Sequence, residues 1–219
     1  MAEKKQPSLI RSRAPVAPQP VLTLLLLALS SLATLVPQIR AAWILERHAV
    51  LHGELWRIFT CHLVHFTPTH LSYNLIVLAV AGWLVEKKSR VLFLFLYMTV
   101  AIAVCVALLV LHPGMQYYGG LSGVGCGFVL YNALLLAKQP GPWQVTGWII
   151  LIALPAKVIL EFFTQGSLLP YPGALEFFTM PLSHCAGMLA ALSCFVAVQL
   201  WSRIAFSNHG KFNSSSANH

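Results

Sequence analysis

Long apolar runs are the feature of this sequence that most restricts its fold. A helix of about 20 apolar residues spans the hydrocarbon core of a bilayer, and the 219-residue chain contains several runs of this kind. Charged residues make up only 9% of the sequence, whereas soluble domains contain about 25%. A chain of this composition is solvated mainly by lipid, so we expect an all-α polytopic membrane protein.

Breaks between the apolar runs predict six membrane-spanning helices. The breaks include a polar segment at 38–66, the turn His112-Pro113-Gly114 and a loop rich in Gly and Pro at 164–176. The expected helices cover residues 21–37, 68–85, 91–111, a fourth segment that begins near the glycines of 119–127 and ends at 138, and then 143–163 and 177–202. They form a membrane domain at 21–203, with flexible cytoplasmic tails at 1–20 and 204–219. Segment 38–66 is too polar to span, so we expect it at the membrane interface.

The distribution of basic residues predicts the orientation of the helices. With six spans, ten Lys and Arg residues fall on the side of the two termini, and Arg40, Arg47 and Arg57 fall on the other side. Cytoplasmic loops carry an excess of Lys and Arg, so both termini are expected in the cytoplasm. The net charge of +8 therefore requires no nucleic-acid partner. Lys157 interrupts the fifth helix, and we expect it to snorkel to the outer interface. Its four-residue spacing from Glu161 allows the two side chains to pair.

The composition excludes several classes of active site. The sequence contains no Asp, which rules out an aspartyl dyad and a Ser-His-Asp triad. Neither an H-E-x-x-H motif nor paired C-x-x-C motifs occur, so no metal site is expected. The five cysteines are odd in number and lie mostly within apolar runs, so they predict no disulfide framework. We interpret Cys126 and Cys185 as packing residues. The histidines expected at the interface are His48, His52, His62 and His112.

Polar side chains from three distant parts of the chain are expected at one face of the membrane. Ser122 opens the fourth helix within the stretch GGLSGVGCG, and His184 lies near the outer start of the sixth helix. His65, His70 and Asn74 lie around the outer start of the second helix. Ionisable and polar side chains inside membrane spans mark functional sites, so their convergence predicts a site.

These side chains are suited to nucleophilic catalysis. A histidine, with an ordinary pKa of about 6.5, can remove the proton of a serine hydroxyl at neutral pH, so His184 is the candidate base for Ser122. The backbone amide of Ser122 has no partner within its helix and can stabilise an oxyanion. Side chains of Asn74 and of His70 or His65 can add donors. Taken alone, Ser122 could equally be a packing serine, and His65 a structural contact.

Glycines around Ser122 are expected to serve two purposes. Gly120 and Gly123 leave room for the backbone of a substrate to approach the serine. Small residues also recur every four positions, which allows membrane helices to pack closely, and close packing is what a Ser122–His184 hydrogen bond requires. The small residues are Gly119, Gly123 and Gly127 in the fourth helix and Ser183, Gly187 and Ala191 in the sixth.

Together, these motifs resemble the signature of the rhomboid intramembrane serine proteases. The matching motifs span about 50–203 and are Trp56-Arg57, H-x4-H-x3-N at 65–74, GGLSG at 119–123 and SHCAG at 183–187. The resemblance implies a six-helix rhomboid-like bundle with Ser122 as nucleophile and His184 as general base. It also implies that His70 and Asn74 surround the oxyanion and that Trp56-Arg57 is a structural motif of the first outer loop.

The resemblance implies an activity as well. A rhomboid-like serine endopeptidase hydrolyses a peptide bond in or beside a client transmembrane segment, here at the outer membrane face. It needs no cofactor, and its partners are membrane-anchored proteins. The run YGGLSGV at 118–124 is similar to the rhombosortase branch, which implies processing of C-terminal Gly-Gly anchors of exported proteins. That branch would place the chain in a bacterial inner membrane with its active site facing the periplasm.

Two departures and two alternatives accompany this interpretation. Many rhomboids have a tyrosine four residues after the serine, where this chain has Cys126, and Ala191 stands where a glycine is common. One alternative is a proteolytically inactive rhomboid-like protein that binds or escorts membrane clients, although such relatives commonly lose the serine or the histidine. The other is a transporter or channel, which would carry polar residues near mid-membrane on several spans.

Overall fold

A computed structural model of the chain describes residues 19–164, 166 and 180–216, and within this part helices predominate. The long helices are α1 (Val21–Leu35), α5 (Pro68–Lys88), α6 (Arg90–Leu111), α7 (Ser122–Leu136), α8 (Pro142–Thr164) and α9 (Pro181–Ser216). Between α1 and α5 lie α2 (Pro37–Trp43), β1 (Leu45–Glu46), α3 (Arg47–Leu51), α4 (Arg57–Thr60) and the 3-10 turn η1 (Cys61–Leu63). Strand β2 (Tyr117–Tyr118) precedes α7 and pairs antiparallel with β1.

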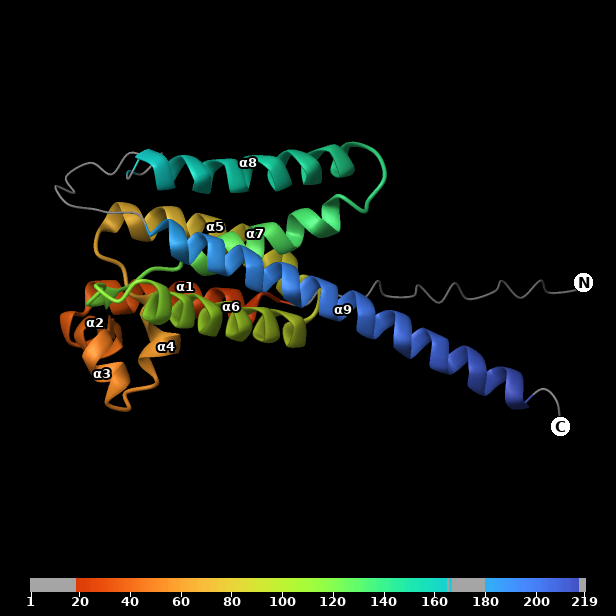
Figure 1. The fold of residues 1–219 in the computed structure, drawn as a ribbon, viewed down its shortest axis with the longest axis horizontal. Helices are drawn as coiled ribbons and strands as arrows, with labels where there is room; N and C mark the ends of the chain where they lie inside the picture. The colour runs from red at the N-terminus through yellow and green to blue at the C-terminus, as the bar shows by residue number, and fades with distance from the viewer. Residues whose placement is uncertain (1–18, 165, 167–179, 217–219) are drawn as a thin grey trace, which may run out of the picture.

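The long helices form a bundle, and the short elements α2 to α4 gather at one end of it (Figure 1). Helix α7 lies in the middle, in contact with α5, α6, α8 and α9. It has only 15 residues, so at 1.5 Å per residue it is about 22 Å long, shorter than a hydrocarbon core of about 30 Å. A short central helix leaves space at its end, and β2 and residues 119–121 precede it there.

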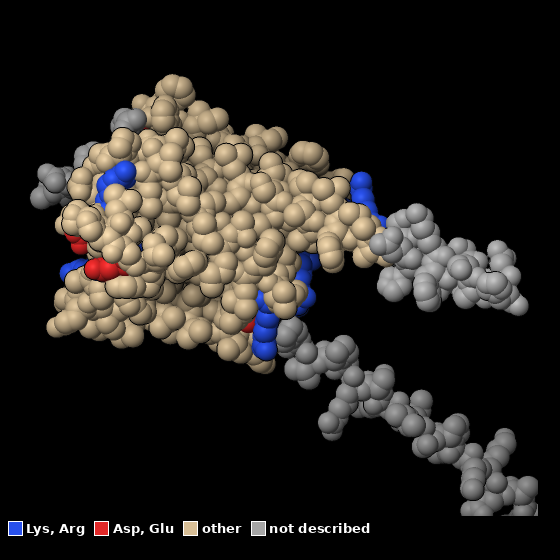
Figure 2. Space-filling view, turned by 60° about the horizontal axis from the view of Figure 1, so that its bottom comes forward, with Lys and Arg blue, Asp and Glu red and all other residues tan. Residues whose placement is uncertain are grey.

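The described helices confirm an all-α, multi-pass membrane protein. Within the described ranges, four helices are long and apolar enough to cross a membrane: α5, α6, α8 and α9 up to Ala205. The bent pair α1 and α2 would make a fifth, and α7 is apolar but shorter. Figure 2 shows Lys, Arg and Glu towards the two ends of the molecule, with an uncharged surface between them. The count of six spans stays a prediction.

Two helices end at other residues than expected, and parts of other expected segments are not described by the structure. The first helix ends at Leu35, before its expected end at 37, because Pro37 disfavours a helical conformation at Val36, and α2 then leaves at 109°. Helix α9 continues to Ser216 rather than ending at 202, because no proline follows Pro181 and backbone hydrogen bonding does not need apolar side chains. Residues 1–18 of the expected first tail, 165 and 167–176 of the expected loop at 164–176, and 177–179 at the expected start of the sixth helix lie outside the described residues, as do 217–219.

The expected Trp56-Arg57 motif ties the short elements together. The Arg57 guanidinium donates to the carbonyl oxygens of Ala41 at 2.9 Å and Ile44 at 2.7 Å. Its Nε lies 2.7 Å from the Glu54 carboxylate, and Trp56 Nε1 donates to the carbonyl of Ala42 at 3.2 Å. These bonds hold α2 and α4 beside each other.

A buried carboxylate joins α1 to α5. Glu86, near the end of α5, is 1% exposed and accepts hydrogen bonds from the amides of Leu22 at 2.9 Å and Thr23 at 2.8 Å. The Thr23 hydroxyl donates to it as well, at 2.8 Å, and Arg90 lies 3.6 Å away. The first amides of a helix have no partner within it, so Glu86 caps α1 from another helix.

Candidate active site

Helices α7 and α9 approach each other at glycines. A Cβ atom at Gly123 would lie 2.9 Å from the carbonyl oxygen of Ser183, and one at Gly127 would lie 2.9 Å from that of Gly187. A Cβ at Gly187 would overlap the carbonyl oxygen of Gly123. A carbonyl cannot rotate aside as a side chain can, so these positions fit only glycine. The predicted close packing of the two helices is confirmed at Gly123, Gly127 and Gly187, whereas Gly119 precedes α7 and lies against Val64 instead.

Ser122 and His184 flank this contact. Ser122 is the first residue of α7, directly before Gly123, and it is partly exposed. His184 directly follows Ser183 on α9 and is 3% exposed. The contact between Gly123 and Ser183 therefore brings the two predicted catalytic residues to the same level of the bundle.

Glu161 of α8 holds the ring of His184. The Nδ1 atom of His184 lies 3.1 Å from Oε2 of Glu161, and Lys157 Nζ lies 2.8 Å from the same oxygen. The predicted Lys157–Glu161 pair is confirmed, but the contact with His184 was not predicted. The absence of Asp excludes one kind of triad, but a Glu can take the same place. The available signal was the position of Glu161 in the last turn of its apolar helix.

His65 holds the loop that leads into Ser122. Its Nδ1 lies 3.3 Å from the carbonyl oxygen of Leu63, and its Nε2 accepts from the amide of Leu121 at 3.4 Å. Burial and the adjacent His70 lower the pKa of His65 to about 3, so the ring is neutral and its Nε2 can accept. The structure thus places His65 as a support for the residue before Ser122.

The ring of His70 lies against Gly120, two residues before Ser122. A Cβ at Gly120 would lie 2.7 Å from His70 Cε1, and Gly120 has a φ of +137°, so both space and backbone conformation require glycine. The rings of His70 and His65 pack edge to face with their centroids 4.8 Å apart. Two predicted site histidines and the loop before the serine therefore form one packed unit.

Asn74 lies one turn after His70 on α5 and is 6% exposed. Its Nδ2 donates to the carbonyl oxygen of His70 at 2.9 Å. An amide nitrogen carries two hydrogens, so this bond fixes the side chain while using one of them.

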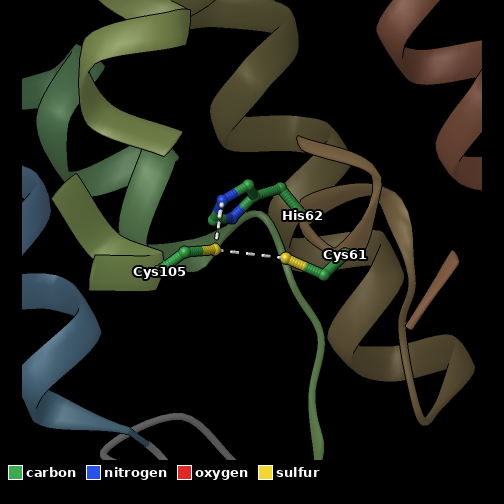
Figure 3. Close-up of side chains that lie close together, drawn as sticks. All are labelled: Cys61, His62 and Cys105. Carbon is green, nitrogen blue, oxygen red and sulfur yellow. Dashed lines mark hydrogen bonds between the residues drawn. The ribbon is translucent and has the colours of Figure 1, made fainter. Parts of the chain in front are cut away.

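A buried group of two thiols and an imidazole lies between α6 and η1 (Figure 3). The Sγ of Cys105 lies 3.5 Å from both Cys61 Sγ and His62 Nε2, and all three side chains are fully buried. The expectation that His62 lies at the interface is therefore wrong, because its Nε2 contacts the carbonyl of Ala101 at 3.1 Å inside the bundle. Sequence motifs could not find this group, since Cys105 comes from a distant helix.

These ligand types suit a soft metal ion, and the side chains of Cys105 and His62 also contact backbone carbonyls. The Cys105 thiol donates to the carbonyl of Ile58 at 3.2 Å, and the Cys61 carbonyl accepts from the amide of Gly120 at 3.1 Å. We interpret the group as the contact that holds η1, and the loop before Ser122, against α6.

The two cysteines nearest in sequence to the predicted catalytic residues differ in environment. Cys126, one turn after Ser122, is buried in the bundle, as expected of a packing residue. Cys185, next to His184, is exposed, so the packing interpretation is wrong for it. Ser183 and Gly187 face α7, and Cys185, midway between them in sequence, points away from that contact.

Comparison with known proteins identifies the family of the chain. The model of the Rhomboid domain matches residues 52–202, well over half of the 219-residue chain. The matched range includes Ser122, Glu161, His184 and the segment from His65 to Asn74. A search of curated proteins finds no match. The length of the match and the order of the motifs show that the chain belongs to the rhomboid family.

Proposed function

We propose that this protein is an active intramembrane serine endopeptidase with Ser122 as nucleophile and His184 as general base. Rhomboids are serine proteases that act on membrane proteins within the bilayer. The observation that supports the proposal is the glycine contact between α7 and α9, because Gly123 directly follows Ser122 and Ser183 directly precedes His184. Catalytic hydrogen bonds tighten in the substrate complex, and there His184 Nε2 accepts from the Ser122 hydroxyl.

The reaction follows from these roles. As the Ser122 Oγ attacks the carbonyl carbon, its proton passes to His184, and the C–O bond forms while the carbonyl becomes an oxyanion. The amide of Ser122 and the side chains of Asn74 and His70 stabilise this charge. His184 then protonates the leaving amine as the peptide bond breaks. Water, deprotonated by His184, hydrolyses the acyl-enzyme and releases Ser122, so no cofactor takes part.

The substrate class follows from the physics of a helix in lipid. An intact transmembrane helix hides its peptide bonds in hydrogen bonds, and unsatisfied backbone groups in lipid cost several kcal/mol each. Clients should therefore have residues that weaken a helix where they meet Ser122, and Gly costs about 1 kcal/mol relative to Ala. The similarity to rhombosortases supports a Gly-Gly pair in the C-terminal anchor of an exported protein as the target.

The basic residues support an orientation for this site. Lys87, Lys88 and Lys138 lie at the end of the bundle opposite the start of α7, and basic residues favour the cytoplasmic side. Both termini then lie in the cytoplasm, and the site faces outward. In a bacterial inner membrane it faces the periplasm.

Cleavage of a synthetic client in proteoliposomes tests the proposal. The client carries a Gly-Gly pair at the outer end of its span, and product is followed by mass spectrometry. Ser122→Ala and His184→Ala should each abolish cleavage, and the double variant should be no worse, because members of a catalytic unit are non-additive. If each single variant lowered the cleavage rate only modestly, and the double variant lowered it by the product of the two effects, the proposed Ser122–His184 catalytic pair would be contradicted.

Two controls accompany this test. A client with Leu-Leu in place of Gly-Gly should be cleaved poorly, and undiminished cleavage at the same bond would refute selection by helix weakness. A fluorophosphonate probe should label the wild-type protein and not Ser122→Ala. If the wild-type protein neither reacts with the probe nor cleaves the client, the inactive client-binding alternative replaces the proposal.

A further inference from the structure

Glu161 is an unusual residue for its position. It is 1% exposed, yet it lies on α8, where only 17% of the apolar window is buried, against 33% to 39% in the other three span candidates. A buried carboxylate is costly unless cations or donors compensate it. A surface-facing helix offers many positions where a carboxylate would avoid this cost, so the inward position calls for an explanation.

The compensation comes from two groups on one oxygen. Lys157 Nζ, one turn earlier on α8, lies 2.8 Å from Oε2, and His184 Nδ1, on α9, lies 3.1 Å from it. The Lys157 side chain is 30% exposed, whereas that of His184 is 4% exposed. Lys157 therefore brings positive charge from the rim of the bundle to the carboxylate, and the carboxylate presents negative charge to the imidazole inside.

This arrangement determines which nitrogen of His184 carries the proton. An ionised carboxylate can only accept hydrogen bonds, so Nδ1 must donate, and the neutral ring then has its lone pair on Nε2. That is the tautomer a general base needs when Nε2 takes the proton of a serine. The imidazolium that forms during the reaction is also stabilised by the adjacent negative charge.

We propose that Glu161 positions His184, so that the candidate site is a Ser122–His184–Glu161 triad in which Lys157 keeps the carboxylate charged. The inference rests on the proposed function. It assigns Glu161 no contact with the substrate, because Glu161 acts through the ring of His184.

The chain supplies a matched control in Glu86. Glu86 is also 1% exposed, and it also has a cation four residues away, Arg90 at 3.6 Å. It caps α1 and has no place in the proposed site. A Glu→Gln change keeps the shape and removes the charge at both positions, so a purely structural role would give both variants the same behaviour.

The experiment measures labelling of the full-length protein in detergent by a fluorophosphonate probe. Loss of the tautomer-fixing charge in a triad lowers turnover by about 10⁴-fold, and we expect Glu161→Gln to lower kinact by about 10²- to 10⁴-fold with KI unchanged. Glu161→Asp should recover part of kinact. Glu86→Gln should lower the unfolding temperature and leave kinact unchanged. A kinact for Glu161→Gln within threefold of wild type would overturn the inference.

A second measurement does not depend on any variant. ¹⁵N NMR of histidine-labelled protein should show His184 protonated at Nδ1 in the neutral ring, and a resonance protonated at Nε2 would overturn the inference even if Glu161→Gln fails to fold. The two proposals fail separately. If the probe does not label the wild-type protein, the proposed protease function is refuted. If the probe labels the wild-type protein and the Glu161→Gln variant at the same rate, only the role of Glu161 is refuted.

Discussion

Replacing Gly127 by alanine tests whether the α7–α9 contact sets the geometry of the site. The new Cβ would lie 2.9 Å from the carbonyl oxygen of Gly187, while ordinary contacts begin at 3.4 Å. The shortfall is therefore about 0.5 Å, and Val100 Cγ2, 3.0 Å away on the other side, limits any shift of the Cβ. Since the carbonyl cannot turn aside, α7 and α9 must separate by about this distance.

Both rate and stability should respond to this separation. A misplacement of about 1 Å can lower catalysis by about 10²-fold, so half that displacement should slow fluorophosphonate labelling of Ser122 by about tenfold. Overpacking of a core costs about 1–3 kcal/mol, which should appear as a lower unfolding temperature in detergent.

Gly125→Ala is the control on the same helix. Its Cβ would lie 3.1 Å from Val77 Cγ1, a side-chain methyl that can rotate, so labelling should stay within about twofold of wild type, as expected of a tolerated core change. Gly127→Ala with a wild-type labelling rate would refute the reasoning, as would an equal loss in Gly125→Ala.

Two further predictions concern the oxyanion and the topology. Asn74→Ala should lower turnover by about 10²–10³-fold, as loss of one oxyanion donor does, with little change in KM, and full turnover would remove Asn74 from the site. Reporter fusions after Lys88 and Lys138 should report the cytoplasm, and a fusion at Gly114 should report the outside. An external signal after Lys138 would put Ser122 on the wrong side of the membrane.

Features that depend on residues close in sequence, or on a repeated spacing, could be predicted. The apolar runs located α5, α6 and α8 to within a few residues, because hydropathy reflects solvation by lipid directly. The i, i+4 pair of Lys157 and Glu161 followed from the geometry of one helix. The four-residue spacing of small residues predicted the α7–α9 contact, because only a glycine backbone allows such an approach.

Contacts that depend on how helices rotate against one another could not be predicted. The Glu161–His184 bond requires the inner faces of α8 and α9 to meet, and a largely apolar helix gives little sign of which face is inner. The contact of Cys61 and His62 with Cys105 depends in the same way on how η1 packs against α6. The sequence shows Pro37, but the 109° bend between α1 and α2 depends on where α2 packs.

The cap that Glu86 provides for α1 has a consequence for biogenesis. The amides of Leu22 and Thr23 are hydrogen-bonded by a residue 64 and 63 positions later in the chain. When α1 leaves the ribosome, Glu86 has not yet been synthesised, and unsatisfied amides cannot enter lipid without a cost of several kcal/mol each. Until α5 has been translated, these two amides therefore need water or lipid headgroups as acceptors. The cap on α1 can form only after α5 has been made.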